Sequence, residues 1–155
     1  MPERLTDLPV LNLPEAALRL RELPRGRQIY DAFRKKWVSL TPEEWVRQHM
    51  LHYIHQHCAY PANKIAVEFS LTVNGLKKRA DILVWNRQLE PWLLIECKNT
   101  SVVLNQEVMD QMLRYNLKLK VPYMAMTNGN GLLVLKNQNG KAEVLEVLPA
   151  YEAER

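Results

Sequence analysis

Residues 80–85 (ADILVW) and residues 92–98 (WLLIECK) decide the fold of this chain. Both are short apolar runs rich in branched and aromatic residues, which is typical of buried β-strands. The largely polar residues 86–91 (NRQLEP) separate them, so we expect the two strands to form an antiparallel hairpin. An acid lies near the open end of each strand, Asp81 on the first and Glu96 on the second.

The predicted hairpin brings these two acids together. If its turn is centred between Gln88 and Leu89, Asp81 and Glu96 are equally far from the centre and pair directly. Directly paired residues have Cβ atoms about 4.5–5.5 Å apart on one face of the sheet, where two carboxylates repel each other. Because Mg²⁺ prefers hard oxygen ligands, it would turn this repulsion into attraction. Lys98 follows Glu96 by two residues, so it shares that face. We therefore predict a metal site.

The alternative is a structural ionic cluster in which Arg79 and Lys98 neutralise the two acids. It explains less well why both acids face each other at the exit of an apolar hairpin. The metal site is the preferred interpretation.

The flanking sequence completes an α/β pattern. Thr41 is a helix N-cap followed by Pro42, and Asn74-Gly75 is a hairpin turn. The expected core is helix 42–57, strands 65–73, 80–85 and 92–97, helix 105–119 and strand 123–127. A hairpin turning at residues 24–26 with a strand at 36–40 precedes the core, and a hairpin of strands 132–135 and 142–147 follows it. This αβββαβ order predicts a mixed central sheet flanked by helices.

The 155-residue length predicts a single domain. We expect it to span residues 17–150, after an irregular N-terminal arm at 1–16 and before a short tail at 151–155. The two cysteines show no pairing pattern, and no apolar run is long enough to span a membrane. The N-terminus lacks the pattern of a signal peptide. We expect a cytoplasmic protein without membrane contact.

The net charge of +4 is mild, but the basic residues cluster at 34–36, 77–79 and 114–120. Such clusters suit a polyphosphate partner. The alternative is that they are ordinary solvated side chains. No GxxxxGK[ST] motif is present, so the chain does not contain its own ATP-driven motor.

Asp81, followed after the hairpin by Glu96-Cys97-Lys98, resembles the PD-(D/E)xK nuclease superfamily. Residues 41–49 (TPEEWVRQH), 76–82 (LKKRADI) and 127–129 (TNG) are similar to the N-terminal nuclease domain of type I restriction enzyme R subunits, in its small stand-alone form. The resemblance covers residues 29–135. It implies a restriction-endonuclease-like sandwich, to which the two terminal hairpins are additions. Ala80 stands where the name-giving motif has proline, a position that supplies no ligand.

The resemblance also implies roles for individual residues. Asp81, Glu96 and the backbone carbonyl of Cys97 would bind Mg²⁺, for which Mn²⁺ would substitute. Lys98 would lie beside the attacked phosphate. Glu44 matches a helical acid that completes the metal shell, although the capping-box position of Glu44 is an alternative explanation.

Gln111 and Tyr115 match the QxxxY motif of RecB-type members, in which both side chains line the site. They are four residues apart and share a helix face. The alternative is that Tyr115 belongs to the core and Gln111 is a polar neighbour. Further phosphate contacts are expected from four basic residues, which are Arg79, Lys77, Lys78 and Arg114.

The function that the resemblance implies is Mg²⁺-dependent DNA endonuclease activity of restriction or defence type. Since the chain has no motor motif, the expected partners are DNA, a separate helicase or translocase, other restriction-modification subunits, or a second copy in a homodimer. The alternative is a catalytically silent nucleic-acid-binding or assembly module with the same fold.

Two further groups of residues are not assigned to the site. His49, His52, His55 and His57 drift around their helix and have no second half of a zinc motif. Glu68 lies on the strand next to that of Asp81. One interpretation is that it approaches the metal, but an edge-facing carboxylate is the simpler one.

Overall fold

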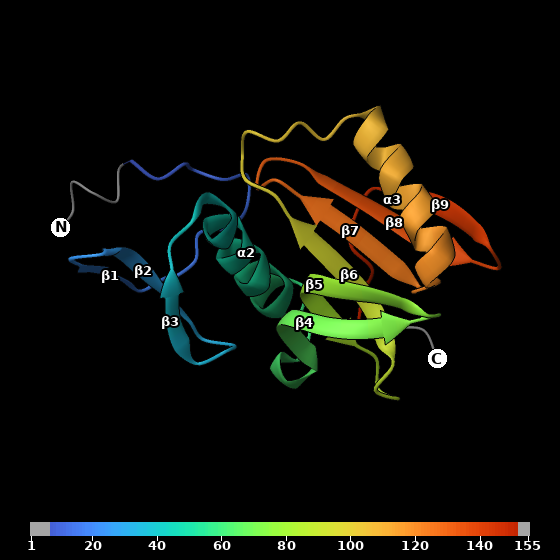
Figure 1. The fold of residues 1–155 in the computed structure, drawn as a ribbon, viewed down its shortest axis with the longest axis horizontal. Coiled ribbons are helices and arrows are strands. Elements are labelled where there is room, and N and C mark those ends of the chain that lie inside the picture. Colours follow the sequence, from blue (N-terminus) through green and yellow to red (C-terminus); the bar gives the residue numbers. More distant parts are fainter. Residues whose placement is uncertain (1–6, 152–155) are drawn as a thin grey trace.

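The computed structural model describes residues 7–151, which form a three-stranded sheet beside a six-stranded sheet (Figure 1). In chain order the elements are β1 (Leu20–Leu23), β2 (Gly26–Asp31), β3 (Lys36–Ser39), α2 (Pro42–His52), the π-helical turn η1 (Tyr53–His57), the 3₁₀ turn η2 (Ala62–Lys64), β4 (Ile65–Val73), β5 (Leu76–Trp85), β6 (Pro91–Cys97), α3 (Gln106–Leu119), β7 (Tyr123–Thr127), β8 (Leu132–Gln138) and β9 (Lys141–Leu145).

The large sheet has the order β4-β5-β6-β7-β8-β9. Only β6 and β7 are parallel, and α3 connects them; the other neighbours are antiparallel. The mixed sheet and the predicted order of helices and strands are thus confirmed.

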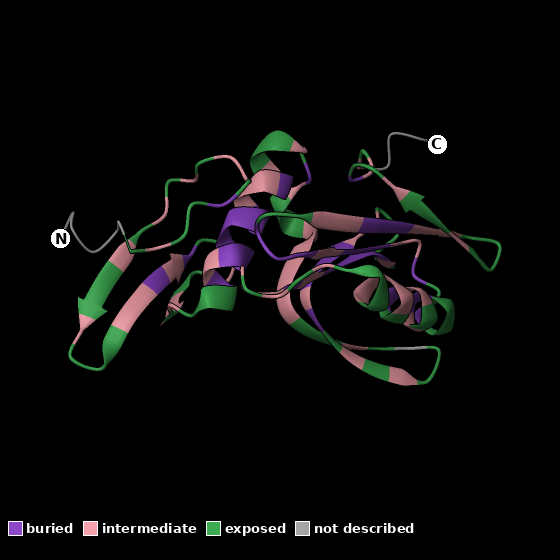
Figure 2. Cartoon of the chain, turned by 90° about the horizontal axis from the view of Figure 1, so that it is seen from above, coloured by how far each residue is buried: buried purple, intermediate pink, exposed green. Residues whose placement is uncertain are grey.

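The two long helices cover opposite faces of this sheet. Ile82 and Leu93 pack in one apolar cluster with α2, whereas the adjacent Leu83 and Leu94 pack in a second cluster with α3. Because successive strand residues point to opposite faces, the two clusters lie on opposite sides of the sheet. Figure 2 shows the buried residues concentrated in α2 and the central strands, whereas the tips of the hairpins are exposed.

The small sheet leads directly into α2. Strands β1 and β2 form the predicted hairpin, and the predicted strand β3 pairs with β2 in antiparallel orientation. The N-cap Thr41 follows β3, and its hydroxyl accepts a hydrogen bond from the Glu44 N–H at 3.0 Å. The predicted helix 42–57 is correct in extent but changes to π-helical geometry at Tyr53.

The main error in the predicted bounds concerns β5, which begins at Leu76 rather than at residue 80. Its first four residues (LKKR) are paired with β4 but include exposed lysine and arginine side chains, so the sequence pattern conceals them. Strand β8 likewise extends to Gln138 through polar residues, whereas β9 ends at Leu145 instead of residue 147.

Both ends of the described chain pack against the core. In the N-terminal arm, Leu11 is buried, and the Asn12 N–H donates to the Gly129 carbonyl at 2.8 Å. At the other end, the Tyr151 hydroxyl donates to the Trp85 carbonyl at 2.8 Å. Residues 1–6 and 152–155, which include parts of the predicted arm and tail, lie outside the described residues. Within residues 7–151, no helix is long and apolar enough to cross a membrane.

Candidate active site

The β5–β6 hairpin opens at Asp81. Its backbone pairing ends at Ile82 and Ile95, in the register predicted from the sequence, and a bulge near Trp85 absorbs the irregular turn. Beyond this pair the backbone hydrogen bonds between the strands stop. There the Asp81 carboxylate accepts a hydrogen bond from the Cys97 N–H at 2.7 Å. The register therefore brings Asp81 and Glu96 to the point where the two strands separate. The predicted direct pair of Asp81 with Glu96 is wrong, because the ladder ends one position before it.

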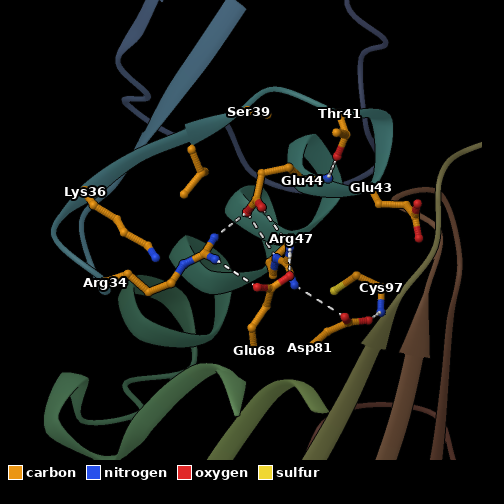
Figure 3. Close-up of a pocket in the computed structure, with 11 residues that line it drawn as sticks. Arg34, Lys36, Ser39, Thr41, Glu43, Glu44, Arg47, Glu68, Asp81 and Cys97 are labelled. Atoms are coloured by element: carbon orange, nitrogen blue, oxygen red, sulfur yellow. Dashed lines mark hydrogen bonds and ion pairs between the residues drawn. The ribbon is translucent and has the colours of Figure 1, made fainter. Parts of the chain in front are cut away.

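The neighbouring strand β4 is also irregular at this level. Pairing with β5 runs from Val67–Ile82 to Phe69–Ala80 and skips Glu68, which has a φ of +50°. A non-glycine residue with this conformation inside a strand is strained, and such strain often occurs at functional sites. The Glu68 side chain points into a cavity beside Asp81 (Figure 3), so the preferred interpretation of an edge-facing carboxylate is wrong and the alternative, an approach to the site of Asp81, is favoured.

This cavity has a volume of about 460 Å³ and lies between β3, the start of α2 and the open end of β5–β6. Its charged lining comes from five elements or loops, and the charged residues are Arg34, Lys36, Glu43, Glu44, Arg47, Glu68 and Asp81. Cys97 lines it as well, so the backbone carbonyl of Cys97 stays a candidate ligand.

Glu44 is the centre of the charges in the cavity. It is buried, and its carboxylate accepts hydrogen bonds from Arg47 at 2.7 and 3.0 Å, from Arg34 at 3.0 Å and from Gln48 at 3.0 Å. Burial alone would raise the pKa of Glu44, but these donors hold the pKa below its usual value. Of the two hydrogen bonds of a capping box, the one from the Glu44 N–H to the Thr41 hydroxyl forms. The Glu44 side chain instead accepts hydrogen bonds from the two arginines.

Arg47 links Glu44 to two further acids of the cavity, Glu68 and Asp81. Its guanidinium lies 3.1 Å from Glu68 and 3.3 Å from Asp81. Arg34 makes a similar bridge, with 2.6 Å to the buried Asp31 and 3.4 Å to Glu68. We call these residues the Glu44 network; its members are Asp31, Arg34, Glu44, Arg47, Gln48, Glu68 and Asp81.

Glu96 faces the other helix. It forms an ion pair with Lys78, whose ammonium also lies 5.1 Å above the ring of Tyr115 on α3. Burial raises the pKa of Glu96, the ion pair with Lys78 opposes this, and the nearby charge of Asp81 raises the pKa further. The structural cluster considered as an alternative thus exists, with Arg47 and Lys78 as the counter-ions in place of Arg79 and Lys98.

The remaining predicted residues are more scattered. Lys98 is half-buried and donates its backbone N–H to the Thr127 carbonyl at 2.8 Å; within residues 7–151 its ammonium has no ion-pair partner. Gln111 is exposed on α3, one turn before Tyr115. Arg79 is exposed and pairs with Glu68 at 2.9 Å. The last two, Lys77 and Arg114, are exposed.

The donor atoms at the strand opening suit a hard divalent cation. Asp81 and Glu96 supply carboxylate oxygens close enough for one to raise the pKa of the other, and Cys97 can add its carbonyl. In the described part of the chain, no three His, Cys, Asp or Glu side chains already surround one point. Arg47 and Lys78 supply the positive charges that neutralise Asp81 and Glu96. A metal ion bound between the two acids would therefore have to displace at least one of these side chains.

Sequence reasoning missed Arg47 and Arg34 as site residues and gave a place near the metal only as the alternative interpretation of Glu68. A signal for Arg47 does exist, because it follows Glu44 by three residues on a helix whose neighbouring positions Val46 and Met50 are fully buried. The signal for Glu68 is its position on the strand next to that of Asp81. Arg34 has no comparable signal, since it reaches the cavity only through tertiary contacts.

The histidines of α2 and η1 have separate environments. Nδ1 of His49 lies 2.8 Å from the Trp45 carbonyl, and Nδ1 of His55 lies 2.8 Å from the Tyr60 carbonyl. The ring of His57 stacks on Tyr53.

Comparison with known proteins places this geometry in context. No curated protein is similar enough to count as a relative. A solved structure, a fragment assigned to the HsdR subunit of a type I restriction enzyme from Vibrio vulnificus YJ016, superposes with a TM-score of 0.53 at 21% identity. The match covers 73% of this chain but only 24% of that one, and it shows a shared fold. Residues 42–149, from α2 to beyond β9, match the family model of the type I restriction enzyme R protein N terminus. The chain therefore belongs to the family of type I restriction enzyme R protein N-terminal domains.

Proposed function

We propose that this domain is a Mg²⁺-dependent DNA endonuclease of restriction or defence type, with a restriction-endonuclease-like fold and a PD-(D/E)xK site. The observation that carries the proposal is the opening of the central hairpin at Asp81 and Glu96, beside a charged cavity of about 460 Å³. Two carboxylates at a strand opening have no structural advantage by themselves, because each is partly buried and they repel each other. Membership of the restriction family supports the assignment.

The proposed reaction requires metal ligands, a positive charge at the phosphate and further phosphate contacts. Asp81, Glu96 and the Cys97 carbonyl would hold Mg²⁺. When bound, the ion supplies Lewis acidity at the phosphate and a nucleophilic water at neutral pH. Lys98 would stabilise the negative charge that develops on the phosphate. Gln111 and Tyr115 would approach the phosphate from α3.

Glu44 acts as a positioning residue in this proposal. Four donor contacts already occupy its carboxylate, so it anchors Arg34 and Arg47 beside Asp81 and Glu68. A guanidinium so anchored can contact a phosphate oxygen in the cavity with little loss of conformational entropy.

The test is nicking of supercoiled plasmid with Mg²⁺ or Mn²⁺ by the wild type, Asp81→Asn and Lys98→Met. We expect at least about a 100-fold loss of rate in each variant. Glu43→Gln is the control, since Glu43 is an exposed acid at the same cavity. Wild-type nicking that survives EDTA, or that persists in both site variants, would refute the proposed site.

A second candidate is a silent binding or assembly module. The pairing of Asp81 with Arg47 and of Glu96 with Lys78 favours it, because the acids already have internal counter-ions. Calorimetric titration with Mn²⁺ separates the two candidates. Binding that Asp81→Asn abolishes supports the nuclease, and no binding by the wild type supports the silent module.

A partner subunit is part of the proposal. The chain spans about a quarter of the HsdR fragment that it matches. Because its family takes its name from one subunit of a type I restriction enzyme, we propose that a translocase or another restriction-modification subunit acts together with this domain. Plasmid nicking that appears only in the presence of such a subunit would support this assignment.

A further inference from the structure

The positive charge of this protein is concentrated in one short segment. Residues 19–36 contain seven Lys and Arg and two acids, a net charge of +5, whereas the whole chain has +4. The rest of the chain is therefore slightly acidic. This segment forms most of the small sheet and precedes residues 42–149, the part that matches the restriction family.

One face of the small sheet combines arginine with aromatic side chains. Strand pairing aligns Tyr30 with Trp37, and the Tyr30 N–H donates to the Arg19 carbonyl, so these three residues form one cross-strand row. Arg21 pairs with Gln28 in the next row. Because cross-strand neighbours point to the same side, both rows share one face. We call Arg19, Arg21, Tyr30 and Trp37 the Arg–aromatic face.

The guanidinium groups of this face are held over the rings. Arg19 lies 4.8 Å from the ring centroid of Tyr30 and 5.3 Å from that of Trp37, and Arg21 lies 4.3 Å from that of Trp37. Both arginines are exposed, and among residues 7–151 neither forms an ion pair with a carboxylate. Cation–π contacts thus hold the two guanidinium groups in place, and no acid among these residues neutralises their charge.

The Arg–aromatic face is directed away from the molecule. Ile29 and Asp31 point to the opposite side of β2 and are fully buried. The sheet nevertheless adjoins the candidate active site, because Lys36, Val38 and Ser39 of β3 line its cavity. A ligand on the Arg–aromatic face therefore lies next to the strand that borders the site.

We propose that the Arg–aromatic face binds a single-stranded segment of nucleic acid. Exposed bases would stack on the guanidinium planes and on the Trp37 and Tyr30 rings, while the arginine N–H edges contact phosphates. A duplex suits this face less well, because its bases are already stacked on one another. This inference deepens the proposed function, on which it rests for the choice of substrate, but the binding itself needs no cleavage.

The experiment measures the fluorescence anisotropy of labelled dT₂₀ and rU₂₀ in EDTA, where the proposed metal-dependent cleavage does not occur. We expect Arg19→Gln/Arg21→Gln to weaken binding by at least about tenfold. The slope of log affinity against log salt should become shallower by about 1.4, since two phosphate contacts are lost. The two probes distinguish DNA from RNA as the source of the single strand.

The charge-matched control is Lys64→Gln/Lys141→Gln, which removes two lysines, from η2 and β9, that lie outside the three basic clusters. It should bind the oligonucleotides within about twofold of the wild type. An equal loss in both double variants, a twenty-base-pair duplex bound as tightly as dT₂₀, or displacement of dT₂₀ by polyglutamate of equal charge would overturn the inference.

Asp81→Asn keeps this test separate from the proposed nuclease activity. In this background, Arg19→Gln/Arg21→Gln should weaken dT₂₀ binding by the same factor as in the wild-type background. If the wild type binds through the Arg–aromatic face but never nicks plasmid with metal, the inference holds and the nuclease proposal fails. If nicking depends on Asp81 while the two arginines do not affect binding, the nuclease proposal holds and the inference fails.

Discussion

Glu44 is a buried carboxylate that forms ion pairs with two arginines at once. These ion pairs determine how far its substitution would lower the free energy of unfolding. Glutamine at this position keeps the shape but leaves Arg34 and Arg47 with one fewer negative charge in a poorly solvated cavity. Removing one partner of a buried ion pair commonly costs about 3–5 kcal/mol. We expect Glu44→Gln to lower the free energy of unfolding by about 3 kcal/mol, measured by urea denaturation.

The neighbouring Glu43→Gln is the matched control for this measurement. Glu43 is exposed in the same helical turn, so its substitution should change the free energy of unfolding by less than about 0.5 kcal/mol. Similar values for the two variants would show that the Glu44 network contributes little to stability.

Among the elements, the turn between β7 and β8 joins the N-terminal arm to the core. Gly129 has a φ of +88°, and its carbonyl accepts the Asn12 N–H. A Cβ at this position would lie 2.7 Å from Cδ2 of Leu11 and 3.3 Å from Cγ2 of Val46. The turn therefore needs glycine both for its conformation and for its space.

We expect Gly129→Ala to lower the free energy of unfolding by about 1–2 kcal/mol, because an L-residue in the left-handed region is strained. The shift of Leu11 adds to this cost. The control is Gly131→Ala, whose Cβ would meet Leu104 at an ordinary 3.5 Å without a positive φ. Thermal unfolding of both variants checks the prediction, and equal melting temperatures would contradict it.

At the scale of the whole molecule, Arg34 ties the small sheet to the large one. Its guanidinium reaches Asp31 at the end of β2, Glu44 on α2 and Glu68 on β4. Without these bridges, we expect the small sheet to open more often while the large sheet stays closed.

Hydrogen exchange followed by mass spectrometry tests this expectation. In Arg34→Gln the amides of residues 20–39 should exchange faster, and those of β6 to β8 should keep the wild-type rate. Lys35→Gln, at the exposed neighbour, should leave both regions unchanged. A uniform increase over all strands in Arg34→Gln would mean that Arg34 stabilises the whole fold rather than the junction.

The sequence by itself determined the local parts of this structure. The Thr41 cap and the register of the β5–β6 hairpin depend on residues close together in the chain, and both agree with their predictions. That register is also why Asp81 and Glu96 could be placed at one strand opening before the structure was known. The early start of β5 was missed because its exposed lysines and arginine give no apolar alternation.

Only the tertiary structure decided which charges meet at that opening. Arg47 comes from a helix, Arg34 from the loop after β2, and Glu68 from a strained point of β4, and no short-range pattern relates these segments. The same holds for Lys78, which alternation alone could not assign to Glu96. Local spacing fixes a hairpin through backbone geometry, whereas the partners of a buried charge depend on how distant elements pack around it.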